Sequence, residues 1–366
     1  MRVLVVTPWF PTAKRPSFTP FMVRDVEMLQ RDHEVVVLHL GHPNDLVGEQ
    51  TVIEQDRVVR VPFHHTMPST WLRAAKILRS FAKSADVVHT MALPALLPAA
   101  LARIRVPWIH TEHYSGVISP PVSRRQAFSL GIFKQLLRLP DRVVGVGKPL
   151  AAALAKYRHD EVPVIPNHVE VSLGVKGEGP GLSSSTVDLV SVGALVPNKG
   201  PIEAVQTLAE LRRRGVDASL TWVGDGPLLE KVCGVAAQLG VSEHVSLPGA
   251  VLPGEVGHML ESADLFLLPT AYETFGVALA EALAAGLPVV ASGTGGHLDF
   301  LPEWASRMAD RSPVALADAV QALLLETEDV SRERIRSYAA GCFRSGRRRD
   351  EYREVYSTTI SAWERT

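Results

Sequence analysis

The chain has 366 residues, 46% of them apolar, with 38 basic and 39 acidic side chains. A formal net charge of −1 argues against a protein that binds nucleic acid through bulk charge, and the length suffices for two domains with separate cores. Cys233 and Cys342 lie far apart without metal-ligand spacing, so we expect reduced thiols and a cytoplasmic location. We also expect no signal peptide and no membrane span, because no window is long and apolar enough.

Short Val- and Ile-rich stretches alternate with helical patterns along the first half of the chain. We expect strands at 2–7, 34–40, 86–90, 107–111, 142–146 and 162–165, with helices such as 21–30 and 69–82 between them. A Gly- and Ser-rich stretch, LGVKGEGPGLSSST at 173–186, has no periodicity and predicts a linker.

The same alternation restarts after the linker. We expect strands at 187–193, 218–224, 244–249, 264–269 and 288–292, and helices at 200–214, 226–239, 254–262, 275–285, 313–326 and 331–342. The pattern predicts two Rossmann-like, doubly wound α/β domains, at 1–170 and 187–345, joined by a linker at 171–186 and followed by a terminal helix at 346–366. Ligands of such sheets lie beyond the carboxyl ends of the strands, so two facing domains would form a central cleft.

Two loops at expected strand ends in the second domain have the chemistry of an anion or ring site. The first runs from Gly193 to Gly200 and contains Lys199, which can add a point charge to backbone N–H groups or can be an ordinary solvated lysine. The second places Gly249 and Val251 where they can line a planar ring or form only a turn. Helix capping and turn chemistry suffice to explain the glycine-rich stretches 223–232 and 292–297.

A third loop, YETFGVALAEALAAGLPVV at 272–290, keeps Glu273 and Glu281 in an otherwise apolar stretch. Burying a carboxylate is unfavourable unless a basic side chain or a ligand pairs with it. If the interval were wholly helical, the rise would be roughly 12 Å. That exceeds the separation of an acid/base pair, about 5–9.5 Å, but suits the two ends of one elongated ligand. N–H groups at Thr274, Phe275 and Gly276 would then face its middle, as in a sugar nucleotide.

ETFGVALAEALAAGLPVVAS resembles the E-x7-E signature of the retaining glycosyltransferases of the family-4 type, which have the GT-B fold. VIPNHVE, VGALVPNKG, VGDGPLLEKV and ADLFLLPTAYETFG also resemble motifs of that family, in the same order along the chain. The resemblance implies transfer of a hexosyl sugar from a nucleoside-diphosphate sugar, with UDP favoured, to a hydroxyl acceptor. It further implies retention of configuration by a same-face mechanism assisted by the leaving phosphate.

The resemblance also implies roles for individual residues. Lys199 would bind the diphosphate as it leaves, Glu273 would contact the transferred sugar, and Glu281 would accept hydrogen bonds from the ribose. His113 would lie near the donor sugar, or else be a structural histidine, and the terminal helix would pack back toward the first domain. The expected donor site comprises Gly193, Lys199, Gly249, Val251, Glu273, Thr274, Phe275, Gly276, Val277 and Glu281.

The chain departs from the family pattern in two places. Ala194 stands where the family usually has an arginine that meets the diphosphate. The first loop, PWFPTAKRPSFTPF at 8–21, lacks the Gly-Gly of many relatives and offers Phe10, Lys14, Arg15 and Phe18 to an acceptor, or packs as a surface loop. No Asp-x-Asp occurs, so we expect neither a metal nor a cofactor.

Several alternatives stay open at this point. A sugar-nucleotide epimerase or a phosphorylase can share the fold, as can a donor-binding but inactive homologue. A dinucleotide-dependent oxidoreductase is disfavoured because no G-x-G-x-x-G occurs. The acceptor can be a small molecule, a saccharide or a lipid. The basic stretch 123–138 can be a peripheral membrane-surface helix or a helix on the domain surface.

Overall fold

The computed structural model describes residues 1–47, 52–53, 57–121, 123–170, 186–326 and 331–365. Contacts divide the chain into two compact units. Unit 1 comprises Met1–His168 and Ser345–Thr366, and unit 2 comprises Val169–Arg344. The expected linker, 171–186, lies outside the described residues except for Thr186.

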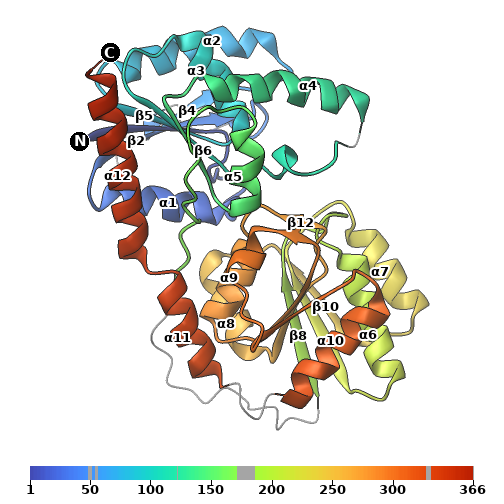
Figure 1. The fold of residues 1–366 in the computed structure, drawn as a ribbon. Coiled ribbons are helices and arrows are strands. Elements are labelled where there is room, and N and C mark those ends of the chain that lie inside the picture. Colours follow the sequence, from blue (N-terminus) through green and yellow to red (C-terminus); the bar gives the residue numbers. More distant parts are fainter. Residues whose placement is uncertain (48–51, 54–56, 122, 171–185, 327–330, 366) are drawn as a thin grey trace. The chain divides into compact units, whose positions relative to one another are not determined.

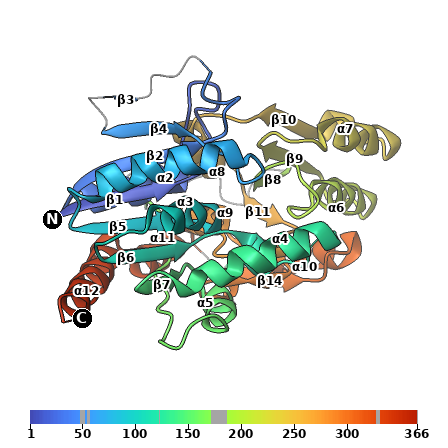
Figure 2. The same ribbon diagram turned by 90° about the horizontal axis from the view of Figure 1, so that it is seen from above.

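Unit 1 is built on a seven-stranded sheet in the order β3-β4-β2-β1-β5-β6-β7. The strands are β1 (Arg2–Thr7), β2 (Glu34–Gly41), β3 (Val52–Ile53), β4 (Val58–Pro62), β5 (Val87–Met91), β6 (Trp108–Glu112) and β7 (Arg142–Gly145). All neighbours are parallel except the β3–β4 pair at the edge. Figure 2 shows β4, β2, β1, β5 and β6 side by side in that order. The helices are α1 (Pro20–Gln30), α2 (Pro68–Ala82), α3 (Leu96–Ala102), α4 (Arg124–Gln135), α5 (Lys148–Ala155) and α12 (Ser345–Trp363).

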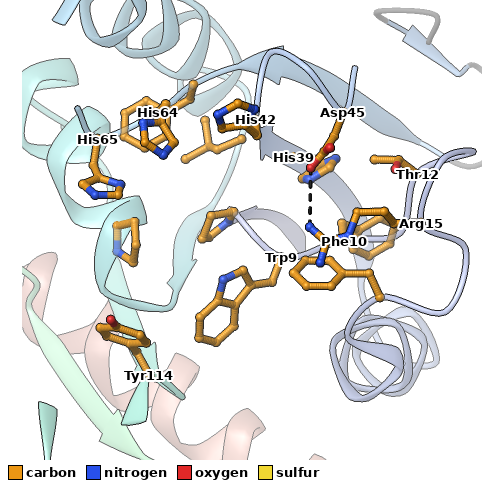
Figure 3. Close-up of a pocket in the computed structure, with 15 residues that line it drawn as sticks. Trp9, Phe10, Thr12, Arg15, His39, His42, Asp45, His64, His65 and Tyr114 are labelled. Atoms are coloured by element: carbon orange, nitrogen blue, oxygen red, sulfur yellow. Dashed lines mark ion pairs between the residues drawn. The ribbon is translucent and has the colours of Figure 1, made fainter. Parts of the chain in front are cut away.

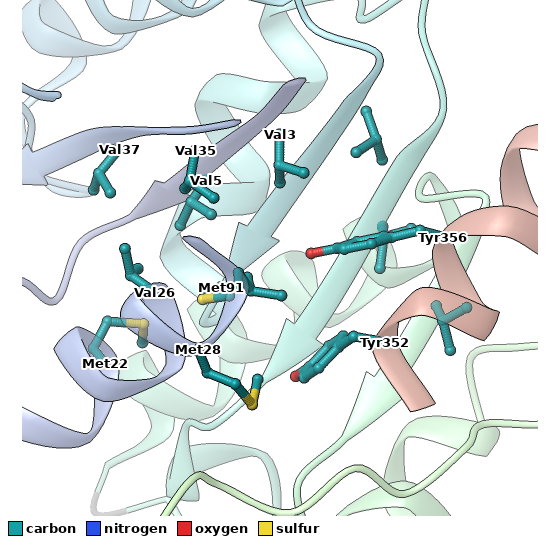
Figure 4. Packing of buried hydrophobic residues seen from close by; sticks show 14 of the residues in the cluster. Val3, Val5, Met22, Val26, Met28, Val35, Val37, Met91, Tyr352 and Tyr356 are labelled. Atoms are coloured by element: carbon teal, nitrogen blue, oxygen red, sulfur yellow. The ribbon is translucent and has the colours of Figure 1, made fainter. Parts of the chain in front are cut away.

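The terminal helix α12 contributes to the core of unit 1. Its Tyr352 and Tyr356 pack among Val and Met side chains from α1 and the central strands (Figure 4). The Tyr356 hydroxyl lies 2.8 Å from Nδ1 of His89, and Nε2 of that ring lies 2.7 Å from Thr111 Oγ1. Burial lowers the pKa of three histidines in this unit to about 3, and we call them the buried histidine set: His39, His89 and His113.

Unit 2 contains a six-stranded parallel sheet in the order β10-β9-β8-β11-β13-β15 and a separate two-stranded sheet, β12-β14. The strands are β8 (Val187–Val192), β9 (Ala218–Val223), β10 (Val245–Gly249), β11 (Leu265–Leu268), β12 (Tyr272–Glu273), β13 (Val289–Ser292), β14 (Thr294–Gly295) and β15 (Ser306–Ala309). The helices are α6 (Pro201–Arg213), α7 (Leu229–Gln238), α8 (Pro253–Ser262), α9 (Val277–Ala284), α10 (Pro313–Glu326) and α11 (Arg332–Cys342). In Figure 1 these helices flank the sheet on both sides.

The predicted pair of doubly wound α/β domains is confirmed. One predicted strand is wrong, because 162–165 contributes only a single bridge between Val164 and Gly145. The predicted helix at 275–285 begins two residues later, at Val277. Among the described residues, no helix is both long enough and apolar enough to cross a bilayer. Helix α4 exposes Phe128 and Ile132, one turn apart, and membrane contact by this helix stays a prediction.

Candidate functional site

Lys199 and Glu273 form an ion pair at the carboxyl-terminal edge of the sheet in unit 2. The Lys199 ammonium lies 2.6 Å from Glu273 Oε1, and the Thr270 hydroxyl donates to the same oxygen at 2.9 Å. The lysine is in the loop that follows β8, and the glutamate is in β12, shortly after β11. Because β8 and β11 are adjacent parallel strands, their following loops meet at one edge. The side chains are 24% and 9% exposed, so the pair is largely shielded from water.

Hydrogen bonds hold these two loops against each other. The Asn198 side chain donates to the Tyr272 carbonyl at 3.1 Å, and the Ala271 N–H donates to the Asn198 carbonyl at 2.8 Å. Gly200 has φ +74°, and a Cβ there would lie 2.1 Å from the Pro269 carbonyl oxygen. The loop that carries the lysine therefore needs glycine where it turns into α6.

The glycine-rich stretch 292–297 does more than turn the chain. Strand β14 pairs with β12, with Gly295 opposite Glu273. A Cβ on Gly295 would lie 1.9 Å from the Glu273 carbonyl oxygen, and one on Gly296 would lie 2.2 Å from the Thr274 carbonyl oxygen. Turn chemistry alone is thus an incomplete interpretation, since these glycines let one backbone pack directly against the segment that carries the acid.

His297, directly after these glycines, is a residue that the sequence reasoning missed. Its side chain is fully buried, and neither ring nitrogen makes a well-formed hydrogen bond within the described chain, although the Ser292 carbonyl is near. Burial lowers the pKa of His297, while the charge of Glu273 raises it and that of Lys199 lowers it, so both charges are close to the ring. The signal that could have found it is a histidine after two glycines at a strand end.

The E-x7-E interval is only partly helical, contrary to the assumption of a wholly helical rise. Glu273 lies in β12, Gly276 is the N-cap of α9 with φ 95°, and the half-buried Glu281 lies in the second turn of that helix. Thr274 and Phe275 precede the helix, so its unpaired first-turn N–H groups begin at Val277 instead.

The remaining residues of the expected donor site have structural contacts of their own. Gly193 lies beside the aliphatic stem of Lys199, since a Cβ added to the glycine would be 3.5 Å from that stem. Gly249 ends β10 and Val251 follows it, two strands away from β8 in the sheet. The Phe275 ring is buried and packs 4.9 Å from the Phe300 ring, which explains its conformation without a ligand.

His113 belongs to unit 1. Asn167 Nδ2 lies 3.1 Å from Nδ1 of His113, and because an amide nitrogen only donates, the proton of the neutral ring is on Nε2. That Nε2 is buried and has no hydrogen-bond partner among the described residues. Nearby, Glu112 accepts three backbone N–H bonds and lies 3.2 Å from His110, so these two residues have structural contacts of their own.

Unit 1 also contains a pocket of about 360 Å³ at the carboxyl ends of its central strands (Figure 3). It is lined by Pro8, Trp9, Phe10, Thr12, Arg15, Phe18, His39, Leu40, His42, Asp45, Phe63, His64, His65, Pro94 and Tyr114. Three of the four residues expected on the acceptor side therefore line it. The fourth, Lys14, does not, and its ammonium donates to the Asn44 carbonyl at 2.8 Å. Within the part of the chain described, no group of three or more His, Cys, Asp or Glu is arranged to hold a metal ion.

Comparisons with known proteins cover both units. Residues 26–173 match the family model "Glycosyltransferase Family 4", and residues 179–341 match "Glycosyl transferases group 1". The D-inositol 3-phosphate glycosyltransferase of Segniliparus rotundus is 28% identical over 248 residues, 62% of this chain and 51% of that protein. A GDP-mannose-dependent alpha-(1-6)-phosphatidylinositol monomannoside mannosyltransferase of Mycobacterium tuberculosis is 34% identical over 149 residues, 38% of this chain and 39% of that protein.

These two alignments span about half, or less, of the curated relatives. A solved structure of sucrose-phosphate synthase from Thermosynechococcus elongatus superimposes with a TM-score of 0.80, covering 99% of this chain and 100% of that chain at 18% identity. At this identity the likeness establishes the GT-B fold.

Proposed function

The chain belongs to the GT-B glycosyltransferases of the family-4 type, and we propose that it transfers a hexosyl sugar from a nucleoside-diphosphate sugar to a hydroxyl acceptor. The observation that carries the proposal is the Lys199–Glu273 pair at the carboxyl-terminal edge of the unit 2 sheet. A cation and a carboxylate at such an edge suit a ligand that has both a diphosphate and sugar hydroxyls.

When the donor binds, Lys199 and Glu273 can exchange each other for partners on the donor. Glu273 neutralises Lys199 in this structure, and a diphosphate would compete for the ammonium with more negative charge. The freed carboxylate then accepts hydrogen bonds from hydroxyls of the transferred sugar, while Glu281 accepts them from the ribose. As the glycosidic bond breaks, Lys199 stabilises the charge that develops on the departing phosphate.

His297, close to both charges of the pair, can supply a second polar group to the donor, which is needed because Ala194 stands in place of the usual arginine. A neutral imidazole in a buried position can donate one N–H to the donor and needs no counter-ion. His297→Asn keeps an N–H donor of similar size and is expected to retain part of the activity, whereas His297→Leu is expected to lose it. Equal activity in both variants would remove His297 from the site.

Retention of configuration follows the proposed same-face course, in which the departing phosphate accepts the acceptor's proton. The base of the nucleotide stays a prediction. The family resemblance favours uracil, in a UDP-sugar, whereas the mannosyltransferase relative is named as GDP-mannose-dependent. Both bases therefore belong in the test.

The experiment is donor turnover with UDP-, GDP-, ADP- and TDP-sugars, measured as release of the nucleoside diphosphate with and without acceptor. Glu273→Ala and Lys199→Ala are expected to abolish release while the protein stays folded. Lys231→Ala, which removes an exposed lysine from α7, is the matched control and is expected to leave turnover unchanged. Full activity in either site variant would refute the assignment. A product rearranged within the nucleotide sugar, without transfer, would favour an epimerase instead.

A further inference from the structure

The pocket of unit 1 has a chemistry that narrows the acceptor. We propose that it binds an uncharged, ring-shaped polyol, such as the hexose unit of a glycoside, and discriminates against the same ring bearing a phosphate. The inference rests on the proposed function, because it takes this pocket as the place where the acceptor binds. It adds the charge and shape of that acceptor.

The walls of the pocket are largely aromatic. Trp9 and Phe10 follow β1, Phe63 follows β4 and Tyr114 follows β6, so the loops after three strands contribute these rings (Figure 3). The Trp9 and Tyr114 ring centroids lie 6.1 Å apart with their planes at 64°. Rings of this kind pack against the apolar C–H face of a pyranose or cyclitol. The volume of about 360 Å³ is near the lower end for small-molecule sites, which suits one or two such rings.

The two fully charged side chains that line the pocket, Arg15 and Asp45, form an ion pair. Arg15 has its guanidinium 3.5 Å from the Asp45 carboxylate and 4.0 Å from the centre of the Phe18 ring. Lys14, the neighbouring cation, is directed to the Asn44 carbonyl and is not among the lining residues. A phosphate would have to displace Asp45 from Arg15 and then lie beside that carboxylate, which repels it.

The histidines of the pocket add hydrogen-bond donors rather than charge. His39 Nδ1 lies 2.9 Å from Arg60 Nη1, and because a guanidinium only donates, that nitrogen is an acceptor and the ring is neutral. His42 Nδ1 accepts from the Asn44 N–H at 3.2 Å, and His64 Nδ1 accepts from the Thr66 N–H at 3.3 Å.

The proton of each neutral ring is therefore on Nε2. Burial lowers the pKa of His64, and the neighbouring His42 ring lowers it further. The pKa of His65 is lowered in the same way, first by burial and then by the His64 ring. Both shifts disfavour a positive charge on these two rings.

Thr12 provides a second, independent sign of a ligand. Thr12 lines the pocket and is only 6% exposed, and its Oγ1 is buried with no hydrogen-bond partner among the described residues. A buried hydroxyl without a partner is unfavourable unless a ligand or water completes it. The Thr12 hydroxyl, the histidine Nε2–H groups and the Asp45 carboxylate together offer both hydrogen-bond donors and acceptors to a ligand. Polyol hydroxyls need both, whereas a phosphate needs donors alone.

Saturation-transfer NMR at pH 7.5 tests this without any donor present. The probes are methyl α-glucoside, methyl α-mannoside and myo-inositol, each compared with its monophosphate. We expect a saturation-transfer signal from at least one neutral ring and binding of its monophosphate that is weaker by about tenfold or more. The signal should be lost in Trp9→Ala and in the conservative variant Thr12→Val. Trp363→Ala, which removes an exposed tryptophan of α12, is the matched control and should bind as wild type does.

Asp45→Asn is the decisive variant. It should free Arg15 and reduce the discrimination against the phosphate, whereas Asp350→Asn, on the surface of α12, should not. Binding of phosphorylated rings alone, or of no neutral ring, overturns the inference. If the protein binds neutral rings but transfers no sugar to any acceptor, the result would instead count against the proposed function. If it transfers sugar to phosphorylated acceptors alone, the proposed function stands and this inference is refuted.

Discussion

Removing the cation from the Lys199–Glu273 pair gives a prediction whose size follows from the structure. Lys199→Met keeps most of the apolar stem but leaves the Glu273 carboxylate, whose side chain is 9% exposed, with only the Thr270 hydroxyl. Breaking a buried ion pair in this way destabilises by about 3–5 kcal/mol. Because the lysine side chain is 24% exposed, water reaches the site, and we expect about 2–3 kcal/mol.

A double-mutant cycle separates the stranded charge from lost packing. Adding Glu273→Gln to Lys199→Met removes the unpaired charge and is expected to restore stability to within about 1 kcal/mol of wild type. Urea unfolding read by hydrogen exchange in peptides from β8 and β11 reports on unit 2 alone. Lys231→Met serves as the control and should change stability by less than about 0.5 kcal/mol. A Lys199→Met variant as stable as this control, or a double variant no better than the single one, would refute the reasoning.

Three further predictions concern acid stability, metals and backbone packing. At pH 5 the unfolded chain protonates the buried histidine set, whereas the folded chain protonates only Asp25, whose pKa burial raises to about 7. Folding thus releases about two protons near pH 5, and between about pH 4 and 5.5 these groups should raise the unfolding free energy of unit 1 by about 2–3 kcal/mol per pH unit. The slope should decrease toward the histidine pKa of about 6.5, where the unfolded histidines are only half protonated. A flat profile in urea titrations would contradict this. Turnover should persist in excess EDTA, and a loss restored by manganese would show that a metal is required. Gly295→Ala would place a Cβ 1.9 Å from the Glu273 carbonyl and should lower the stability of unit 2 by about 3 kcal/mol or more, whereas Gly234→Ala, with open space around it, should be tolerated in thermal unfolding.

The alternation of strands and helices was predictable because buried parallel strands consist of short, nearly continuous runs of apolar residues. RVLVVT at 2–7 and VDLVSVG at 187–193 correspond closely to β1 and β8. The two-residue strands β12 and β14 were not predictable, since each exists only by pairing with the other about twenty residues away. The sequence locally resembles a turn at both places, and only tertiary packing makes them strands.

The site was predictable in its residue types but not in its contacts. Lys199 and Glu273 were identified separately, yet their direct pairing spans 74 residues of sequence and depends on the adjacency of β8 and β11. His297 was missed because a histidine after two glycines at a strand end is a weak local signal, and turn chemistry suffices to explain such a stretch. Its proximity to the pair follows from the β12–β14 register alone.

The central claim is that the donor binds to unit 2 through Lys199, and a crystal structure with a bound nucleoside diphosphate tests it most directly. We expect diphosphate oxygens within hydrogen-bond distance of the Lys199 ammonium, which will have left Glu273. We also expect Glu281 to accept hydrogen bonds from the ribose hydroxyls. A complex in which Lys199 stays paired with Glu273 while the nucleotide binds elsewhere would contradict it.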